Sequence, residues 1–262
     1  FVAVFDELTY WSALFGPMLL DAIPLRPRTR VLDIGCGSGF PLLEIAQRLG
    51  PGSTCIGVDQ WTEAVAAAER KIAYKEIPGA EAIVADAADL PFEDESFDLI
   101  VSNLGINNFS DPAGVLEEAR RVAAGKSSLV MTTNLSGHFN LFYSAFEDTL
   151  RDQGLTDVLQ PFEEHVAHRG SVESITSMLE SSHWHCRSVR TETNAIRYLN
   201  GTALLHSYFT RLAFLPAWTE LIPEGRRKEL FSRLESKLNA IAAERGELAL
   251  EVPAACFVAE PV

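Results

Sequence analysis

Short apolar runs alternate with longer stretches of helical periodicity between residues 30 and 133. Each run is apolar almost throughout, which is typical of parallel strands that helices cover on both faces. The predicted strands are residues 30–34, 54–59, 82–86, 97–102 and 128–133. This pattern predicts an α/β fold built on a doubly wound sheet, which binds ligands at the carboxyl ends of its strands.

Several helix starts are also visible in the sequence. Asp111 suits an N-cap and Pro112 the first helical position, because proline supplies the helical φ and needs no N–H there. Ser171 suits the N-cap of a later helix. Apolar residues at helical spacing predict further helices within residues 139–150 and 230–241. We interpret these last two helices as insertions that form a lid.

Length and composition suit one elaborated domain. The 262 residues are 47% hydrophobic, which is enough to bury a sizeable core. We predict a single domain over residues 1–262. Its predicted parts are a helical cap (1–29), a ligand-binding core (30–134), helical inserts (135–170 and 200–245) and closing strands (186–193 and 255–259).

Net charge and cysteine spacing exclude some classes of partner and indicate a cellular location. The chain has 22 Lys and Arg against 36 Asp and Glu, and the net charge of -14 repels nucleic-acid phosphates. Cys36, Cys55, Cys186 and Cys256 form no C-x-x-C pair, so we expect no zinc site and no disulfide framework. We therefore predict a cytoplasmic location. The uncharged run over residues 8–20 is too short to span a membrane.

A glycine-rich turn follows the first predicted strand. Gly35, Gly37 and Gly39 alternate with other residues, and a helix is predicted to open at Pro41. Glycine permits positive φ and lets backbone amides approach a ligand, while a helix start adds free N–H groups. The turn predicts a site for a small, partly anionic ligand.

Two carboxylates extend this site toward a nucleoside. Asp59 ends the second predicted strand, where a carboxylate can accept two hydrogen bonds from a ribose diol. Asp86 ends the third predicted strand. There it can accept a hydrogen bond from the exocyclic amine of adenine, while the Ala87 amide can donate one to a ring nitrogen. A dinucleotide fingerprint needs a third glycine at position 40 or 42, and these positions hold Phe40 and Leu42. The nucleoside is therefore not expected to be a nicotinamide dinucleotide.

The glycine turn, the spaced carboxylates and the turn after the fourth predicted strand form one combination. Its residues are Asp33, Gly35, Gly37, Gly39, Asp59, Asp86 and the turn from Ser102 to Gly105. This combination resembles the class I S-adenosylmethionine-dependent methyltransferases. More narrowly, it is similar to the small-molecule branch that includes the ubiquinone/menaquinone C-methyltransferases. The resemblance is specific over residues 30–133.

The resemblance implies a Rossmann-like sheet of about seven strands, mostly parallel with an antiparallel last strand. It implies S-adenosylmethionine as cofactor, S-adenosylhomocysteine as product, and a small, partly apolar methyl acceptor. The backbone at Gly35 and Gly37 would contact the methionine moiety, and Asp59 the ribose hydroxyls. Asp86 and Ala87 would contact the adenine.

Further roles follow from the same resemblance. The carbonyl of Asn103 would lie near the cofactor's amino group. Asp33 would orient the turn amides or take the cofactor ammonium through water. Gln60 or Trp61 would pack on the adenine face. One departure is local: Ala123–Lys126 replaces the Lys-Pro-Gly-Gly turn that is usual in the family before the fifth strand.

Candidate catalytic groups are few. His138 follows the fifth predicted strand and Tyr10 lies in the predicted N-terminal cap, and both are candidate general bases for a phenol, enol or carbon acid. An amine acceptor would need no base. No histidine pair has the supporting ligands of a metal site, so no metal is predicted.

Two alternatives remain open from the sequence. A non-catalytic protein that binds S-adenosylmethionine would keep every motif described above. A nicotinamide-dependent oxidoreductase would share the sheet and the ribose carboxylate, but it lacks the third glycine of its fingerprint.

Overall fold

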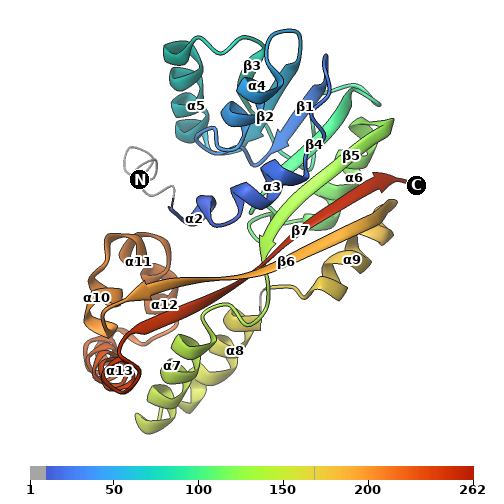
Figure 1. Cartoon of the computed structure of the whole chain (residues 1–262). Coiled ribbons are helices and arrows are strands. Elements are labelled where there is room, and N and C mark those ends of the chain that lie inside the picture. Colours follow the sequence, from blue (N-terminus) through green and yellow to red (C-terminus); the bar gives the residue numbers. More distant parts are fainter. Residues whose placement is uncertain (1–9, 168) are drawn as a thin grey trace. The chain divides into compact units, whose positions relative to one another are not determined.

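The computed structural model describes residues 10–167 and 169–262. The helical cap predicted for residues 1–29 therefore lies partly outside the described residues. The strands form a seven-stranded sheet in the order β3-β2-β1-β4-β5-β7-β6 (Figure 1). They are β1 (Arg30–Ile34), β2 (Thr54–Asp59), β3 (Ala80–Val84), β4 (Phe97–Asn103), β5 (Ala123–Asn134), β6 (Trp184–Tyr198) and β7 (Leu248–Pro261).

Strand pairing confirms the predicted topology. The strands from β3 to β5 pair in parallel, and β7 pairs antiparallel with β5. β1 and β4 are buried at nearly every position, because helices cover this part of the sheet and leave no solvated face. The chain order reverses between β1 and β4, so the carboxyl ends of these two strands flank the switch point at which such sheets bind ligands.

Helices flank the first strands of the sheet. In Figure 1, α4 and α5 lie beside β2 and β3, and α3 contacts β5. The helices of this region are α2 (Tyr10–Ala13), α3 (Gly16–Ala22), α4 (Leu42–Leu49), α5 (Thr62–Lys75), α6 (Pro112–Val122) and α9 (Val172–Ser181).

The predicted helix caps are confirmed. The carboxylate of Asp111 accepts the Gly114 amide at 3.0 Å, and Pro112 is the first residue of α6. Ser171 and Ser174 form a reciprocal capping box at the start of α9.

The contacts divide the chain into two compact units. The first comprises the described residues up to Asn134 together with Ser171–Glu192 and Ala254–Val262. The second comprises Leu135–Gly170 and Thr193–Pro253, which contain the predicted helical inserts. Its helices are α7 (Asn140–Asp152), η2 (Thr156–Val158), α8 (Leu159–Ala167), α10 (Gly201–His206), α11 (Tyr208–Ala213), α12 (Leu215–Glu220) and α13 (Glu224–Arg245). The lid role of these inserts stays a prediction. Among the described helices, none combines the length and apolar character that crossing a bilayer requires.

Several predicted boundaries were wrong. β3 ends at Val84, so Asp86 lies in the following loop, and α4 begins at Leu42 with Pro41 as its N-cap. The predicted turn at residues 123–126 belongs to β5, whose pairing with β4 shifts register near Phe97. β6 and β7 are much longer than the predicted closing strands. Apolar patterning reports burial, and β6 carries many exposed or half-buried residues that weaken the pattern. The added residues of β7 do alternate between buried and less buried positions, so this part of β7 was missed although it carried a signal.

Candidate functional site

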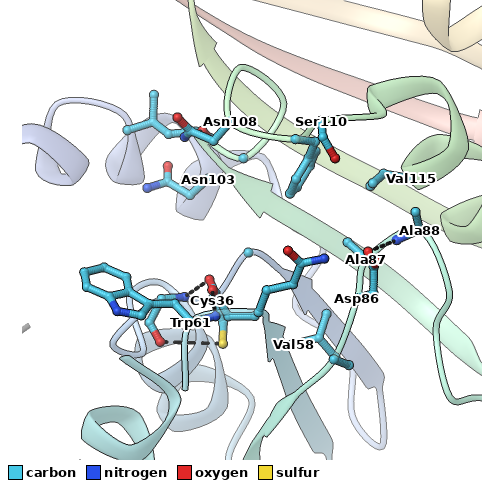
Figure 2. A pocket seen from close by; sticks show the side chains of 18 of the residues that line it. Cys36, Val58, Trp61, Asp86, Ala87, Ala88, Asn103, Asn108, Ser110 and Val115 are labelled. Carbon is cyan, nitrogen blue, oxygen red and sulfur yellow. Dashed lines mark hydrogen bonds between the residues drawn. The ribbon is translucent and has the colours of Figure 1, made fainter. Parts of the chain in front are cut away.

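A cavity of about 490 Å³ lies in the first unit, where β1, β2 and β4 end (Figure 2). Most of the predicted cofactor residues share its wall, although they come from separate parts of the chain. The predicted residues that line it are Gly35, Gly37, Asp59, Gln60, Trp61, Asp86, Ala87 and Asn103.

The glycine turn adopts the conformations that require glycine. Gly35, Gly37 and Gly39 have φ values of 77°, 51° and 105°. A Cβ at Gly37 would meet nothing within 4 Å, so the backbone there is open to the cavity. A Cβ at Gly39 would instead lie 2.3 Å from a methyl group of Leu43. Gly39 does not line the cavity but lets α4 pack closely against the turn.

Asp59 connects the glycine turn to the end of β2. Its Oδ2 accepts the Gly37 amide at 2.9 Å, and its Oδ1 accepts the Trp61 amide at 2.9 Å. A carboxylate oxygen has more than one lone pair, so both oxygens keep acceptor capacity for a ligand. The carboxylate therefore shapes the turn as well as lining the cavity.

The loop after β3 is held by a hydrogen bond within the loop and by hydrogen bonds with α6. Asp86 Oδ1 accepts the Ala88 amide at 2.9 Å, and Glu118 accepts the Leu90 amide at 2.8 Å. Arg121 donates to Leu90 O at 2.9 Å and also pairs with Glu118. The hydrogen bond from Arg121 lowers the pKa of Glu118. These contacts hold the backbone that presents Asp86 to the cavity.

Asp33 lies outside the cavity wall and is fully buried. Burial raises its pKa to about 8; the Leu42 amide opposes this increase and the negative charge of Asp59 adds to it. The neighbouring Cys36 lines the cavity with 1% of its surface exposed. Burial, followed by the charges of Asp33 and Asp59, raises the pKa of the Cys36 thiol, so this cysteine is a weak nucleophile.

The turn after β4 forms the opposite wall. Leu104 has a positive φ of 67°, and its carbonyl accepts Asn108 Nδ2 at 2.9 Å. The Asn108 amide donates to Gly105 O at 2.8 Å. A Cβ at Gly105 would lie 2.6 Å from the Phe109 ring, so this ring packs directly on the backbone. Figure 2 shows Asn103 and Asn108 in this region and Ala87, Ala88 and Val115 toward the other end of the cavity.

Helix α2 contributes Trp11 and Ser12 to the wall. Tyr10, a candidate base, does not line the cavity and is 51% exposed. Phe40 lines the cavity and packs on Gly16 of α3, where a Cβ would clash with its ring. The residue that replaces the third glycine of a dinucleotide fingerprint thus belongs to the wall.

His138, the other candidate base, belongs to the second unit and does not line this cavity. It is 2% exposed, and its ring stacks on Phe139 with centroids 3.8 Å apart. Burial, and secondarily the charge of Arg169, lowers its pKa to about 2. Its catalytic role, like that of Tyr10, stays a prediction. Among the residues that the structure describes, no group of His, Cys, Asp and Glu could hold a metal ion.

Sequence reasoning missed several wall residues. They are Ser12, Ser38, Val58, Ala85, Ala88, Asn108, Phe109, Ser110, Asp111 and Val115. Those after β4 had one available signal, since they follow a strand that ends beside the switch point.

Comparisons with known proteins identify the family and the fold of the chain. The profile of the methyltransferase domain family matches residues 25–179, more than half of the chain. The demethylmenaquinone methyltransferase of Thermotoga maritima is 33% identical over 52% of this chain and 58% of its own. The nocamycin O-methyltransferase of Saccharothrix syringae is 35% identical over 39% of this chain and 37% of its own.

A solved structure shows the same fold. The SAM-dependent methyltransferase from Aquifex aeolicus has a TM-score of 0.56 and 22% identity, covering 72% of this chain and 89% of its own. The chain spans about half the length of the curated relatives it matches. The fold and the family profile define a Rossmann-like methyltransferase architecture. This chain belongs to the methyltransferase domain family.

Proposed function

We propose that this protein transfers a methyl group from S-adenosylmethionine to a small, partly apolar acceptor. The observation that carries the proposal is the arrangement of the glycine turn, Asp59 and Asp86 around one cavity at the switch point of the sheet. The names of the relatives add support, because they include methyltransferases that act on quinones and on nocamycin.

The residues present fit the proposed cofactor. The open backbone at Gly37 and the positive φ of Gly35 provide a cradle that side chains would fill. Asp59 offers carboxylate oxygens for the ribose, with its position already fixed by two backbone amides. Asp86 Oδ1 is oriented by the Ala88 amide beside Ala87, which suits the edge of an adenine.

The chain's own contribution would be mainly positional. S-adenosylmethionine, when bound, supplies an electrophilic methyl group on a sulfonium. The glycine turn and Asp59 would orient the cofactor, while Phe109, Leu104 and Trp11 would exclude water from the cavity. Alignment of nucleophile and methyl carbon in a dry site can be worth about 7–11 kcal/mol in well-oriented systems. No metal and no acid–base triad is required for this reaction class.

The finer features of the proposal concern partners and location. The acidic net charge of -14 argues against a nucleic-acid acceptor. All four cysteines are free, which suits the reducing conditions of the cytoplasm.

Formation of S-adenosylhomocysteine tests the proposal. The chain is incubated with S-adenosylmethionine and a panel of quinol, phenol and amine acceptors, and the product is measured by mass spectrometry. Acceptor-dependent formation of S-adenosylhomocysteine supports methyl transfer. Tight cofactor binding without turnover across the panel would favour the alternative, a non-catalytic S-adenosylmethionine-binding protein.

A further inference from the structure

An unpaired hydrogen-bond donor belongs to a residue that lines the cavity. Asn103 is the last residue of β4, lines the cavity, and is only 8% exposed. Among the described residues, none accepts a hydrogen bond from its Nδ2 atom. A buried amide donor without a partner is unfavourable, and such groups in native proteins call for an explanation.

The orientation of this amide is set by a neighbouring strand. Asn103 pairs with Thr132 of β5 in the sheet register, and Thr132 Oγ1 donates to Asn103 Oδ1 at 2.7 Å. Thr132 is fully buried, so water does not compete for this hydrogen bond. Because the hydroxyl proton engages Oδ1, the NH₂ group is the side of the amide left for another partner.

Several other polar groups of the wall have partners within the protein. Asp111 caps α6 through Gly114, and Asn108 Nδ2 donates to Leu104 O. Asp59 lies at the end of β2 and Asp86 lies in the loop after β3, and both carboxylates are hydrogen-bond acceptors. Asn103 Nδ2 differs from these groups because it is a buried donor for which no described residue acts as acceptor.

The chemistry of the donor selects the kind of ligand atom. A neutral N–H donor favours carbonyl, enolate or phenolate oxygen, whereas an ammonium has only donors and gains nothing from it. The wall near this residue also carries apolar and aromatic side chains, including Leu104 and Phe109. A ring-bearing, oxygen-containing ligand therefore matches the site better than an alkylamine.

We propose that Asn103, held in orientation by Thr132, is a specificity-determining donor to an oxygen atom of the methyl acceptor. This inference rests on the proposed function, because it assumes that the cofactor occupies the glycine-turn side of the cavity. The donor would favour the ionised form of an enol or phenol and would place that oxygen beside the reacting atom. The carboxylate of the cofactor is the competing oxygen, and the experiment separates the two.

The test measures binding by isothermal titration calorimetry. The cofactor probes are S-adenosylhomocysteine and 5′-methylthioadenosine, which lacks the carboxylate. The acceptor probes, 1-naphthol and 1-naphthylamine, are added to the S-adenosylhomocysteine complex; the aryl amine is a poor hydrogen-bond acceptor. The variants are Asn103→Leu, Asn103→Asp and Thr132→Val, and Thr133→Val is the matched control at the adjacent buried threonine of β5.

We expect the unmodified protein to prefer 1-naphthol over 1-naphthylamine by about tenfold. Asn103→Leu and Thr132→Val should reduce this preference to about twofold, and Asn103→Asp should abolish it because an oxygen replaces the donor. Thr133→Val should retain it. Unchanged binding of 5′-methylthioadenosine certifies that each variant is folded, and the two Asn103 variants test the claim independently of Thr132→Val.

Three outcomes would overturn the proposal. The first is that the unmodified protein binds neither naphthyl probe or shows no preference between them. The second is that the preference survives in Asn103→Leu. The third is that Asn103→Leu weakens the binding of S-adenosylhomocysteine by about tenfold and leaves the binding of 5′-methylthioadenosine unchanged. That result would assign the donor to the cofactor carboxylate. Failure of the unmodified protein to bind S-adenosylhomocysteine at all would instead refute the proposed function.

Discussion

Replacing Asp33 by asparagine should change how the stability of the protein depends on pH. Asp33 is fully buried beneath the glycine turn, and burial raises its pKa from 3.8 to about 8. The asparagine side chain would keep the shape of the carboxyl group and remove its ionisation. The prediction concerns the protein without added cofactor, because a bound cation would itself favour the ionised carboxylate.

The sign follows from proton binding. From about pH 4 to about pH 8, the folded chain holds a proton on Asp33 that the unfolded chain has released. The free energy of unfolding contributed by Asp33 therefore falls as the pH rises through this window and is constant above it. The two pKa values differ by about four, and each unit corresponds to about 1.4 kcal/mol, so the upper limit is about 6 kcal/mol.

Urea denaturation followed by circular dichroism measures this effect at a series of pH values from about 5 to 9. The difference in unfolding free energy between Asp33→Asn and the unmodified protein should move in favour of the variant by about 2–4 kcal/mol, because about three pH units of the window lie between pH 5 and the raised pKa. Contributions from carboxylates that do not interact with Asp33 cancel in this difference. Asp157→Asn, at an exposed position, is the matched control and should show no such trend. Parallel stability curves for Asp33→Asn and the unmodified protein would refute the reasoning.

The same contacts support three further predictions. Asp59→Asn should weaken S-adenosylhomocysteine binding by about 1–3 kcal/mol, because a charge-assisted acceptor is lost; an unchanged dissociation constant in a folded variant would contradict the placement of the ribose. Arg121→Ala should lower the unfolding free energy by about 1–2 kcal/mol, because the Leu90 carbonyl loses its donor. The exposed ion pair between Arg121 and Asp94 contributes little. Denaturant unfolding measures this change, and an unchanged unfolding free energy would contradict the prediction. Iodoacetamide should label Cys186 before the three buried cysteines, as peptide mass spectrometry can show; early labelling of Cys36 would contradict its burial and raised thiol pKa.

The sequence predicted the elements that local patterning controls. The apolar runs located β1 and β2 to the residue, and Asp111 with Pro112 located the start of α6. Eight predicted cofactor residues line one cavity, because parallel strands place their carboxyl ends at one edge of the sheet.

Other features depend on contacts between distant residues and had no local signal. The positive φ of Leu104 is one example, since nothing in its sequence neighbourhood demands that conformation. The hydrogen bond between Thr132 and Asn103 is another, because it depends on strand register. The long β6 was also underestimated, since many of its residues are exposed or half-buried and give little apolar alternation.

The central claim is that the cavity at the switch point binds S-adenosylmethionine. Parallel isothermal titrations of the purified chain with S-adenosylmethionine, S-adenosylhomocysteine and NADH test it most directly. The account predicts dissociation constants in the micromolar range, about 1–100 μM, for the first two ligands and no binding of NADH. Binding of NADH alone would contradict it, because the wall formed by Phe40 and the glycine turn would then accommodate a dinucleotide.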